Sequence, residues 1–502
     1  MAITKVGMIG AGSMGGGMTL LLAENGISVS IQDPSTSTVD SLIQSAKDQN
    51  ITSGTLSKHT EYKTLCDSLS SPKVIFFSLP HGTVGDTVVE GLYQYLEKGD
   101  IIIDCSNENW SNTQRRQGKL IAQGVYYIGC GVSGGYQAAR RGPSMCPGGQ
   151  EKGLEIVMPL LEKMSAKAGD GTPCVARIGE GGAGHYVKMI HNGIEHGMMS
   201  AISEAWTFMN KHLGMGYDEI GKVFEKWSAQ GELKNTFLVK IGADICGQKD
   251  KSGNHVLADV QDKVVQDIDG SEGTGIWSNT QATSLHVPAP TLSTAHYLRI
   301  VSAYRGHRQN VNEAFHDSFK PSKIEVKDEG EKEKIVEDLR RAIYTTCLAA
   351  YVQGMSIISK ANSQNKWNID FANIVQIWRA GCIIQSSHIS SILSQIYTSP
   401  PSSETPDLLY APTVVSELTA GFEPLKRIVM IGVQHNAVTP SISATLEYLK
   451  YSGNMELPTQ FYEAELDYFG KHMFDSKKKD GRKDKEGGEP ETGSRHFEWK
   501  KA

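Results

Sequence analysis

Three side chains that can act as acids or bases, and one amide, lie close together near residue 190. Lys188 is followed by His191, Asn192 and Glu195, at distances of three, four and seven residues along the chain. These spacings place all four side chains on one face of a helix. A lysine acts as a general base near neutral pH only if burial or a nearby positive charge lowers its pKa. Spacing alone is equally consistent with a solvated helix face, so both interpretations stay open at this point.

Two glycines in the same segment bear on that choice. Gly184 and Gly193 lie among residues that otherwise show a helical pattern. Since glycine weakens a helix, its presence at these positions indicates close approach of another backbone. A solvated helix face has no need of such close approach, so the glycines favour the functional interpretation.

A glycine-rich turn near the N-terminus predicts a dinucleotide site. The glycines permit a tight turn, let the backbone approach a pyrophosphate and allow close helix packing, while the helix N-terminus faces the phosphates. A predicted strand at 6–9 precedes the turn, and a second predicted strand ends about 20 residues further on, which is the context of a Rossmann fold. The residues of the turn are Gly10, Ala11, Gly12, Ser13, Met14 and Gly15.

Asp33 follows that second strand and bears on the choice of cofactor. A carboxylate at this position accepts hydrogen bonds from both ribose hydroxyls of NAD and repels the 2′-phosphate of NADP. NADP enzymes usually place an arginine nearby, whereas this chain has Gln32, Asp33, Pro34 and Ser35. The sequence therefore predicts a preference for NAD, with NADP as the alternative. The competing interpretation is that Asp33 is a surface turn residue.

Three segments together resemble the 6-phosphogluconate dehydrogenase family, which is part of the wider β-hydroxyacid dehydrogenase superfamily. They are the glycine-rich turn, the segment 131–149 and the segment 184–197 that contains Lys188. The similarity extends along nearly the whole chain, through 101–107, 273–277, 378–382 and 467–472. The resemblance implies an α/β N-terminal Rossmann domain with a doubly wound, mostly parallel sheet, followed by a large all-α domain and a C-terminal tail.

The resemblance also implies oxidation at C3 of a sugar acid followed by loss of CO2. Lys188 would take the proton from the C3 hydroxyl while hydride leaves C3 for the nicotinamide. Protonated Lys188 would then polarise the ketone during decarboxylation, and Glu195 would protonate C1 of the enediol. The product would be a ketopentose, which is ribulose 5-phosphate if the substrate is 6-phosphogluconate.

Further site residues are carried over from the same resemblance. Ser133, Gly134 and Gly135 would hold the substrate carboxylate and nearby hydroxyls, and the alternative for this segment is a tight loop without a ligand. Asn107 would lie between nicotinamide and substrate, and Leu79 would contact the cofactor. The remaining substrate contacts are expected at His191, Asn192, His196, Thr274, Arg299 and His472.

The far end of the expected substrate site departs from the family pattern. His196 replaces a tyrosine, Glu272 replaces a lysine and Leu466 replaces an arginine, whereas Thr274, Arg299 and His472 are retained. A dianionic phosphate about 4 Å from a glutamate would be destabilised by several kcal/mol at an effective dielectric constant of roughly 20. We therefore expect intact chemistry at C1 to C3 and altered recognition of a terminal phosphate.

Three functions follow from this combination. The first is oxidative decarboxylation of 6-phosphogluconate with a rebuilt phosphate site, to which Lys471 or the basic tail would contribute. The second is an NAD-linked reaction of the same kind on a sugar acid without the phosphate, such as an aldonate. The third is a non-catalytic paralogue with a binding or regulatory role. The complete set of Lys188, Asn192 and Glu195 argues against the third.

The elements that must position these residues follow from the apolar pattern. Over residues 4–180, short apolar segments alternate with helical patterns, as in βαβ units of a parallel sheet. From residue 181, apolar spacings of three and four predominate and predict helices. The predicted strands are 6–9, 28–31, 74–78, 101–104 and 126–128; the predicted helices include 183–212, 335–361, 371–397, 441–451 and 459–469. The expected domains are 1–180 (cofactor), 181–440 (helical) and 441–502 (C-terminal helices and tail).

The last part of the chain is predicted to consist of a linker and a short aromatic segment. Residues 476–492 are charged and poor in apolar residues, which predicts flexibility. The basic run 477–485 is interspersed with acidic residues, so a solvated linker is favoured over an anion- or nucleic-acid-binding site. The segment 495–499 carries two aromatic residues and is able to dock on another surface.

Composition argues against several classes of protein. A net charge of −6 gives no reason to expect nucleic acid or an anionic membrane as partner. No apolar stretch of the roughly 20 residues needed to span a membrane is apparent, and the N-terminus lacks the pattern of a secretory signal. The eight cysteines are scattered without metal-like spacing, so we expect unpaired thiols in the cytoplasm and no metal site. The resemblance also implies that the protein forms a homodimer, in which the helical domain forms the interface and the tail reaches the partner's site.

Overall fold

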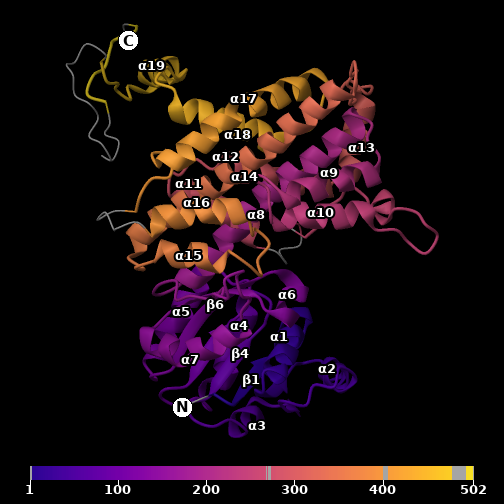
Figure 1. The fold of residues 1–502 in the computed structure, drawn as a ribbon. Coiled ribbons are helices and arrows are strands. Elements are labelled where there is room, and N and C mark those ends of the chain that lie inside the picture. The colour runs from indigo at the N-terminus through magenta and orange to yellow at the C-terminus, as the bar shows by residue number, and fades with distance from the viewer. Residues whose placement is uncertain (1–2, 267, 269–272, 399–404, 477–492, 501–502) are drawn as a thin grey trace. The chain divides into compact units, whose positions relative to one another are not determined.

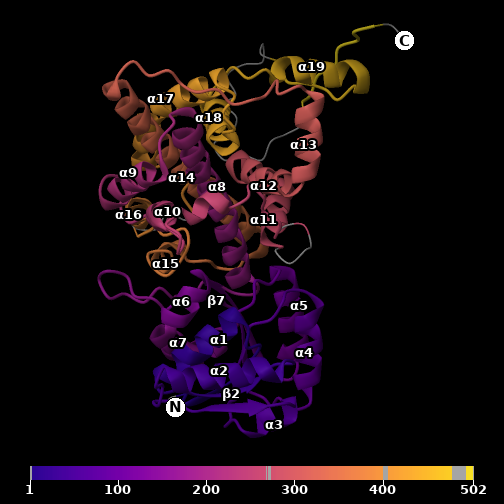
Figure 2. The ribbon, with the colours of Figure 1, turned by 90° about the vertical axis from the view of Figure 1, so that its right-hand side faces the viewer.

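A computed structural model describes residues 3–266, 268, 273–398, 405–476 and 493–500 of the 502-residue chain. The chain forms two compact units, Met1–Leu446 and Glu447–Ala502. In the first unit, a region built on one β-sheet is followed by a region made of helices, and these regions occupy opposite ends of the unit in Figures 1 and 2. The predicted class, an α/β Rossmann region followed by a helical region, is confirmed.

In the described residues, the sheet has seven strands in the order β3-β2-β1-β4-β5-β6-β7. All neighbouring strands are parallel except β6 and β7, which are antiparallel. The order reverses at β1, so the turns that follow β1 and β4 flank the crevice at which open α/β sheets bind ligands. The strands are β1 (Lys5–Ile9), β2 (Ser28–Gln32), β3 (Leu56–His59), β4 (Val74–Phe77), β5 (Ile101–Asp104), β6 (Tyr126–Ser133) and β7 (Ser144–Gly148).

Helices cover both faces of this sheet. They are α1 (Ser13–Glu24), α2 (Thr36–Asp48), α3 (Tyr62–Asp67), α4 (Thr83–Tyr93), α5 (Trp110–Ile121), α6 (Gly135–Arg141) and α7 (Glu151–Met164). Because alternate side chains of a strand point to opposite faces, Val6 and Met8 belong to a core with α1, α2 and α7. Ile9 belongs instead to a second core with α3, α4 and α5. The strands are therefore apolar on both sides, as expected for a buried parallel sheet.

Four strands were predicted within one residue of their observed bounds, β6 extends five residues beyond the predicted 126–128, and two strands lacked a clear signal. β3 has the sequence Leu-Ser-Lys-His, which shows no run of β-branched or aromatic residues. β7 contains Pro147, which a sheet tolerates because β7 is an edge strand. The pattern of local hydrophobicity therefore reported the central strands and missed strands at the two edges of the sheet.

The second region of the unit consists of helices packed around α8 and α14. The helices are α8 (Ala183–Thr207), α9 (Tyr217–Ala229), α10 (Phe237–Gly247), α11 (Thr274–Ser284), α12 (Pro290–Ala303), α13 (Arg305–Ala314), α14 (Glu329–Asn365), α15 (Phe371–Ile377), α16 (Ser387–Tyr397) and α17 (Pro412–Gln434). A π-helical turn, Phe208–His212, extends α8, and a 3₁₀ turn covers Val256–Asp259. α8 packs on α14, α11 and α12, and a Cβ on Gly354 of α14 would lie 2.5 Å from Ile194.

The helix predicted at 371–397 is wrong as a single element. The structure has two helices, α15 and α16, separated by a loop that contains the Trp378–Cys382 motif. Gly381 in this loop has a φ of 68°, and its carbonyl oxygen accepts a hydrogen bond from the backbone N–H of Ser144 in β7. A continuous helix could not make this contact with the sheet, so the tertiary contact overrides the apolar periodicity.

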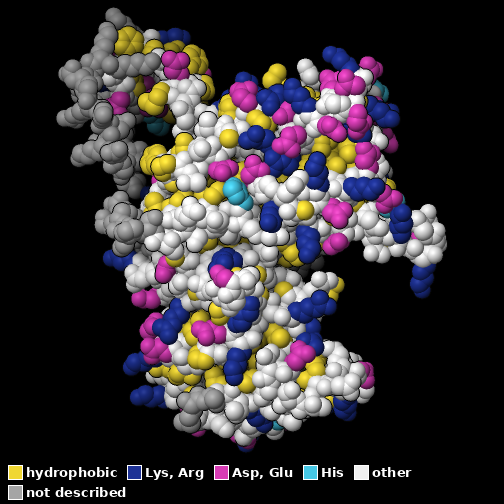
Figure 3. All heavy atoms as spheres, in the orientation of Figure 1, with side chains coloured by type: hydrophobic (Ala, Val, Ile, Leu, Met, Phe, Trp, Pro, Cys, Tyr) yellow, Lys and Arg dark blue, Asp and Glu magenta, His cyan; other side chains and the backbone are white. Residues whose placement is uncertain are grey.

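One helix of the described chain is long and apolar enough, by length and composition, to cross a membrane. It is α14, with an 18-residue window of mean hydropathy 1.2. The helix packs on α8 and α17, and 89% of the window is buried inside the protein, as in the core helix of a folded domain. On the face shown in Figure 3, lysine and arginine side chains are interspersed with aspartate and glutamate.

The second unit contains the end of α18 (Pro440–Gly453) and α19 (Thr459–Gly470). The fully buried carboxylate of Asp467 accepts hydrogen bonds from the backbone N–H groups of Met473 and Phe497 and from the indole of Trp499. His496 Nδ1 lies 2.9 Å from the same carboxylate, and together these donors hold the pKa of Asp467 well below its usual value. The aromatic segment 495–499 thus docks on α19, and the charged run 477–485 lies outside the described residues.

Candidate active site

The glycine-rich turn after β1 forms a cradle that larger side chains would fill. Gly10 has a φ of 96°, and a Cβ on it would lie 2.2 Å from the carbonyl oxygen of Ser78. A Cβ on Gly15 would lie 2.0 Å from the carbonyl oxygen of Gly10, whereas a Cβ on Gly12 would meet no described atom within 4 Å. In the described part of the chain, no side chain caps the adjoining N-terminus of α1. The turn from Gly10 to Gly15 therefore fits the pyrophosphate of a dinucleotide.

Asp33 holds a negative charge beside this turn. Its Oδ2 accepts a hydrogen bond from the backbone N–H of Ala11 at 2.8 Å, and its Oδ1 accepts one from Ser35 at 2.8 Å. The first bond ties the end of β2 to the glycine-rich turn. Each carboxylate oxygen retains capacity for a further donor. The carboxylate is therefore fixed beside the glycine-rich turn.

The loops after β4 and β5 are tied to one another at the same edge of the sheet. The backbone N–H of Leu79 donates to Ser106 Oγ at 3.1 Å, and that of Gly82 donates to Glu108 Oε2 at 3.0 Å. Asn107 lies between Ser106 and Glu108 in sequence, and its side chain is exposed. The loop is therefore held in place while Asn107 stays accessible to a ligand at the carboxyl edge of the sheet.

Helix α8 begins directly against the sheet because glycines let the backbones approach. A Cβ on Gly184 would lie 2.1 Å from a backbone carbonyl oxygen of β6, which confirms the close approach predicted there. At Gly193 the neighbour is the side chain of Ser278 rather than a backbone. A Cβ on Gly131 of β6 would lie 2.2 Å from the Cβ of Lys188. Gly131 thus leaves room for α8 to bring Lys188 against the carboxyl end of β6, at the sheet edge at which the glycine-rich turn lies.

Lys188 is buried, and its Nζ is fixed by a hydrogen-bonded chain. The residue exposes 7% of its surface, and Nζ donates to Asn192 Oδ1 at 2.7 Å. Asn192 Nδ2 in turn donates to Thr274 Oγ1 at 3.0 Å, which brings the first turn of α11 onto the same face of α8. The face of α8 that carries Lys188 and Asn192 is therefore buried rather than solvated.

His191 and Ser133 extend the hydrogen-bonded chain to β6. Asn192 Oδ1 can only accept a hydrogen bond, so His191 Nδ1, which lies 3.1 Å from it, is the donor. The other ring nitrogen, His191 Nε2, then accepts a hydrogen bond from Ser133 Oγ at 2.9 Å. Burial, reinforced by the charge of Lys188, holds the pKa of His191 well below its usual value. The ring is therefore neutral near pH 7. Glu195 Oε2 lies 3.7 Å from His191 Nδ1, and this carboxylate is partly exposed.

The loop that contains Gly134 and Gly135 follows Ser133 directly. Gly134 has a φ of 102° and Gly135 a φ of 68°, and a Cβ on Gly134 would lie 2.3 Å from the carbonyl oxygen of Gly381. The loop is therefore compressed between β6 and the segment that separates α15 from α16. Its backbone conformation requires glycine, which is consistent both with the predicted carboxylate-holding loop and with the alternative of a tight loop without a ligand.

His196 lies one turn beyond Asn192 and faces α11 and α12. Burial, followed by the charges of Arg299 and His296, lowers the pKa of His196 to about 3. Thr274 precedes Gly275, on which a Cβ would lie 2.9 Å from the His196 ring. The structure therefore brings His196, Thr274 and Arg299 to one end of the face that starts at Lys188.

Other residues expected at this end are not brought together within the first unit. Glu272 lies outside the described residues. Leu466 and His472 belong to the second unit, and Leu466 lies on α19. His472 is exposed, and its ring centroid lies 6.2 Å from that of Phe469. A contact that the sequence did not indicate joins His81, in the loop after β4, to Trp277 of α11, with ring centroids 5.0 Å apart.

His185 is a further residue of the site that sequence reasoning missed. Nε2 lies 3.0 Å from the carbonyl oxygen of Asp104 and is the donor of this bond, so Nδ1 accepts from Thr113 Oγ1 at 2.6 Å. The ring thereby fixes the first turn of α8 to the end of β5, and burial lowers its pKa. In the sequence, its position between Gly184 and Lys188 was the only indication that His185 lies close to the site.

Comparisons with known proteins agree on one family. The description "NAD binding domain of 6-phosphogluconate dehydrogenase" matches residues 5–179, and "6-phosphogluconate dehydrogenase, C-terminal domain" matches residues 184–499. The decarboxylating 6-phosphogluconate dehydrogenase of Emericella nidulans is 41% identical over 97% of this chain and all of its own length. The NADP(+)-dependent, decarboxylating enzyme of Bacillus subtilis is 35% identical over 96% of this chain and 98% of its own. Among solved structures, the chain is similar to Plasmodium falciparum 6-phosphogluconate dehydrogenase, with a TM-score of 0.86 and 29% sequence identity. The match covers 95% of this chain and 98% of the Plasmodium chain, which is described in its apo form, with NADP+ and with 6-phosphogluconate.

Proposed function

The chain belongs to the 6-phosphogluconate dehydrogenase family and is a nicotinamide-dependent, decarboxylating dehydrogenase of that type, and we propose that Lys188 is its general base and 6-phosphogluconate its substrate. The observation that carries this proposal is the buried chain of hydrogen bonds from Lys188 through Asn192 to Thr274. It lies at the sheet edge that also holds the glycine-rich turn, which is where open α/β sheets bind ligands.

In the first step Lys188 accepts the proton of the C3 hydroxyl, for which Nζ must be neutral when the substrate arrives. Asn192 Oδ1 accepts one N–H of Lys188 and so directs the lone pair of Nζ away from itself. His191 and Asn192 bind the C3 end of the substrate. When bound, the nicotinamide takes up the hydride that leaves C3.

In the second step protonated Lys188 donates to the C3 carbonyl oxygen and stabilises the negative charge that develops as CO2 leaves. Ser133 and the backbone N–H groups of Gly134 and Gly135 hold the carboxylate before it departs. Glu195, which is partly exposed and close to His191, then protonates the carbon that carried the carboxylate. The product is a ketopentose.

For the cofactor, we propose a preference for NAD, with the glycine-rich turn holding the pyrophosphate and Leu79 and Asn107 facing the nicotinamide. The fixed carboxylate of Asp33 supports this choice, because it accepts ribose hydroxyls and opposes a 2′-phosphate. NADP is the alternative, since relatives from Bacillus subtilis and Plasmodium falciparum are described with NADP+.

The arrangement of chains is a further part of the proposal. We propose a cytoplasmic homodimer with domains 1–180, 181–440 and 441–502, in which the tail brings His472 to the partner's site. The exposed apolar side chains of the second unit support a docking role for the tail. These side chains include Met455, Phe461, Tyr462 and Phe469.

Steady-state kinetics with two acids and two cofactors test the proposal. Turnover of 6-phosphogluconate, with CO2 released in equal amount to reduced cofactor, is the expected result. Preference for gluconate would favour the alternative in which the substrate lacks a phosphate, as the replacements at Glu272 and Leu466 suggest. Absence of turnover with either acid and either cofactor would favour a non-catalytic role.

A further inference from the structure

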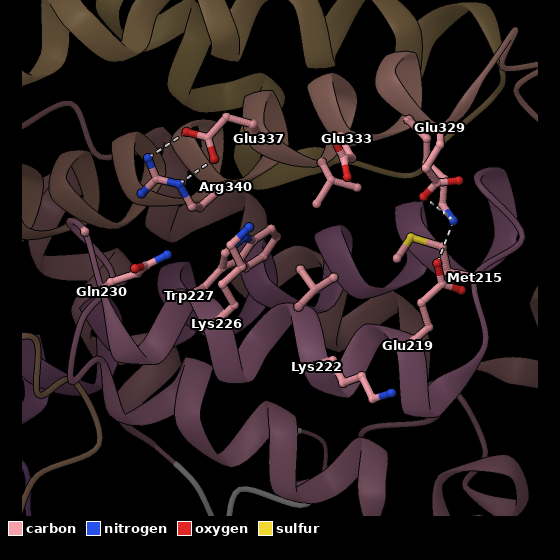
Figure 4. A pocket seen from close by; sticks show the side chains of 14 residues that line it. Met215, Glu219, Lys222, Lys226, Trp227, Gln230, Glu329, Glu333, Glu337 and Arg340 are labelled. Atoms are coloured by element: carbon pink, nitrogen blue, oxygen red, sulfur yellow. Dashed lines mark hydrogen bonds and ion pairs between the residues drawn. The ribbon is translucent and has the colours of Figure 1, made fainter.

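A cavity of about 780 Å³ lies between α9 and the N-terminal part of α14, and Figure 4 shows its lining. The lining carries four glutamates against three lysines and one arginine, so positive and negative charges balance. Lys332 is paired with Glu219 and Glu329, and Arg340 is paired with Glu337. The cavity therefore offers no net charge by which to select a ligand. A more specific arrangement lies where α8 meets β6 and β7.

The stem of the Lys188 side chain rests on a position of β6 that has no side chain of its own. A Cβ on Gly131 would lie 2.2 Å from Cβ and 2.6 Å from Cγ of Lys188, and 2.8 Å from Sγ of Cys146. The antiparallel strands β6 and β7 pair Gly131 with Cys146, so this sulfur comes from the residue directly across the ladder. The lysine stem and the sulfur together fill the space that a side chain at position 131 would occupy.

The Cys146 thiol also ties the first turn of α8 to the sheet. Sγ lies 3.2 Å from the carbonyl oxygen of Gly184 and 3.3 Å from that of Gly131, and its single S–H donates to one of them at a time. In an α-helix the carbonyl oxygen of Gly184 accepts the N–H of the residue four positions further on, which is Lys188. The thiol therefore contacts the turn of α8 that ends at Lys188.

Cys146 remains protonated in this position. It exposes 4% of its surface, and burial raises the pKa of its thiol to about 12 against the opposing charge of Lys188. A thiolate in its place would stabilise the ammonium form of Lys188, whereas a general base must be neutral when the substrate arrives. The thiol therefore supplies a packing contact and a hydrogen-bond donor without a negative charge.

The other end of the lysine side chain is held by a separate set of contacts. Nζ donates to Asn192 Oδ1 at 2.7 Å, and the amide of Asn192 donates to Thr274. These bonds restrain the amine, whereas the direction from which the stem approaches is set at its Cβ and Cγ, against β6 and β7. Lys188 is thus restrained at both ends of its side chain, and the two restraints come from different elements.

We propose that Cys146 is a positioning residue for Lys188, whose stem it holds through packing across Gly131 and through the S–H bond to the first turn of α8, so that Nζ is directed at the C3 hydroxyl. The inference rests on the proposed function, in which Lys188 is the general base. In this role Cys146 touches neither substrate nor cofactor. A displacement of about 1 Å can slow an enzymatic step by about 10²-fold, so a loosened stem should slow hydride transfer rather than weaken cofactor binding.

Replacement of the thiol provides the first test. Cys146→Ala should lower kcat by about 10- to 100-fold and leave KM for the cofactor unchanged. Cys146→Ser keeps a donor at this position and should recover part of the loss. Cys66→Ala, which removes another buried sulfur from α3, is the matched control and should keep the wild-type kcat. A wild-type kcat in folded Cys146→Ala enzyme, or equal losses in the alanine and serine variants, would overturn the inference.

A primary deuterium isotope effect separates positioning from a general loss of folded enzyme. It is measured on kcat/KM with 6-phosphogluconate deuterated at C3. A smaller active fraction lowers the rate and leaves the isotope effect unchanged, whereas a misplaced base makes cleavage of the C3–H bond limit the rate to a greater extent. The isotope effect should therefore rise in Cys146→Ala and stay at the wild-type value in Cys66→Ala.

Reductive methylation followed by mass spectrometry reports on Lys188 without turnover. In ligand-free enzyme, Lys188 should be methylated faster in Cys146→Ala than in wild type, because a less restrained amine reaches solvent more often. The exposed Lys163 provides the reference rate within each sample. Faster methylation in an enzyme that turns over neither 6-phosphogluconate nor gluconate would refute only the proposed function. Turnover by wild type with methylation and isotope effect both unchanged in Cys146→Ala would refute only this inference.

Discussion

At the scale of single residues, the proposed mechanism depends on the position and protonation of Lys188 Nζ. Nζ donates to Asn192, which donates to Thr274, so the amine is held by residues from two helices. Lys188→Ala should lower kcat by a factor of about 10² to 10⁴, the usual contribution of a general acid–base group. The rate of NADH or NADPH formation at saturating substrate measures this loss. Lys163→Ala, at an exposed lysine of α7, is the control, and near-normal turnover in Lys188→Ala would refute the assignment.

Asp33 allows a test of cofactor choice with a change of one atom. Asp33→Asn keeps an oxygen able to accept from Ala11 or Ser35 but removes the negative charge. Relief of repulsion at a partly solvated site is worth about 1 to 2 kcal/mol, so the ratio of kcat/KM for NADP over NAD should rise by about tenfold. A ratio that stays constant, or a wild-type enzyme that already prefers NADP, would show that Asp33 does not set the preference.

Residue patterns along the sequence indicated part of the site and could not indicate the rest. The shared face of Lys188 and Asn192 follows from helical spacing, which is a local property of the chain. The contact with Thr274 joins residues 82 positions apart, and it was expected only because the family resemblance pointed there. His296 shows no motif at all. Its stacking against His196 is revealed only by the packing of α12 on α8.

At the scale of elements, α8 carries three buried histidines whose pKa values all lie below the ordinary value. These are His185, His191 and His196, and burial is the largest cause in each case. A histidine whose pKa is lower in the folded state than in the unfolded state binds its proton preferentially when the chain unfolds. Its contribution to stability is therefore complete above pH of about 6.5 and is lost as pH falls below this value.

Because the pKa values of these histidines are lower in the folded state, the folded enzyme should lose stability in acid. Each of the three histidines should lower the free energy of unfolding by at most about 1.4 kcal/mol per pH unit, over the range between its unfolded and its folded pKa. Urea unfolding of the ligand-free enzyme at pH 7.5, 6.5 and 5.5 measures the slope. His185→Gln should lower the slope, whereas His307→Gln, which changes an exposed ring, should leave it unchanged. Equal stability at pH 7.5 and 5.5 would contradict the prediction.

Helix α5 provides a second test, because two adjacent arginines differ mainly in burial. Arg116 exposes 2% of its side chain and donates to Glu108 and to the carbonyl oxygen of Gly82, which fixes the loop after β4. Arg115 exposes 58% and pairs with Asp86. Arg116→Met should cost about 3 to 5 kcal/mol of stability, because it leaves a buried carboxylate unpaired.

The matched replacement Arg115→Met should cost at most about 1 kcal/mol, as for an exposed ion pair. Denaturant titration of both variants gives the two values on the same scale. Comparable losses in the two variants would show that burial of Arg116 does not determine its contribution. Activity of Arg116→Met should also decline, since Leu79 and Asn107 lie in the two loops that this network joins.

The elements themselves were predictable where local pattern and tertiary structure agree. The central strands and the long helices α8 and α14 show their periodicity in the sequence because their faces are buried along their whole length. The strand β3 is short and partly polar, and the break between α15 and α16 exists because Gly381 contacts β7. Edge strands and loop contacts depend on neighbours distant in sequence, so the sequence pattern does not encode them locally.

At the scale of the whole molecule, the second unit is the part whose purpose is not explained by its own fold. Asp467 anchors the aromatic segment 495–499 to α19, so this unit has internal order. At the same time His472 and several large apolar side chains are exposed. A small unit that is ordered and yet exposes apolar residues is typical of one that binds another surface. A second copy of the chain is the partner we propose.

Hybrid dimers test that proposal. In a homodimer with shared sites, Lys188→Ala and His472→Ala each damage both sites. A heterodimer of the two variants has one site with both replacements and one site with neither, so it should show about half of wild-type activity. Heterodimers isolated with two different affinity tags provide the measurement, and mixtures of the two homodimers kept apart provide the background. If His472 serves the site of its own chain, every site in the heterodimer carries one defect and no activity is restored. Monomeric wild-type enzyme with full activity would exclude a shared site altogether.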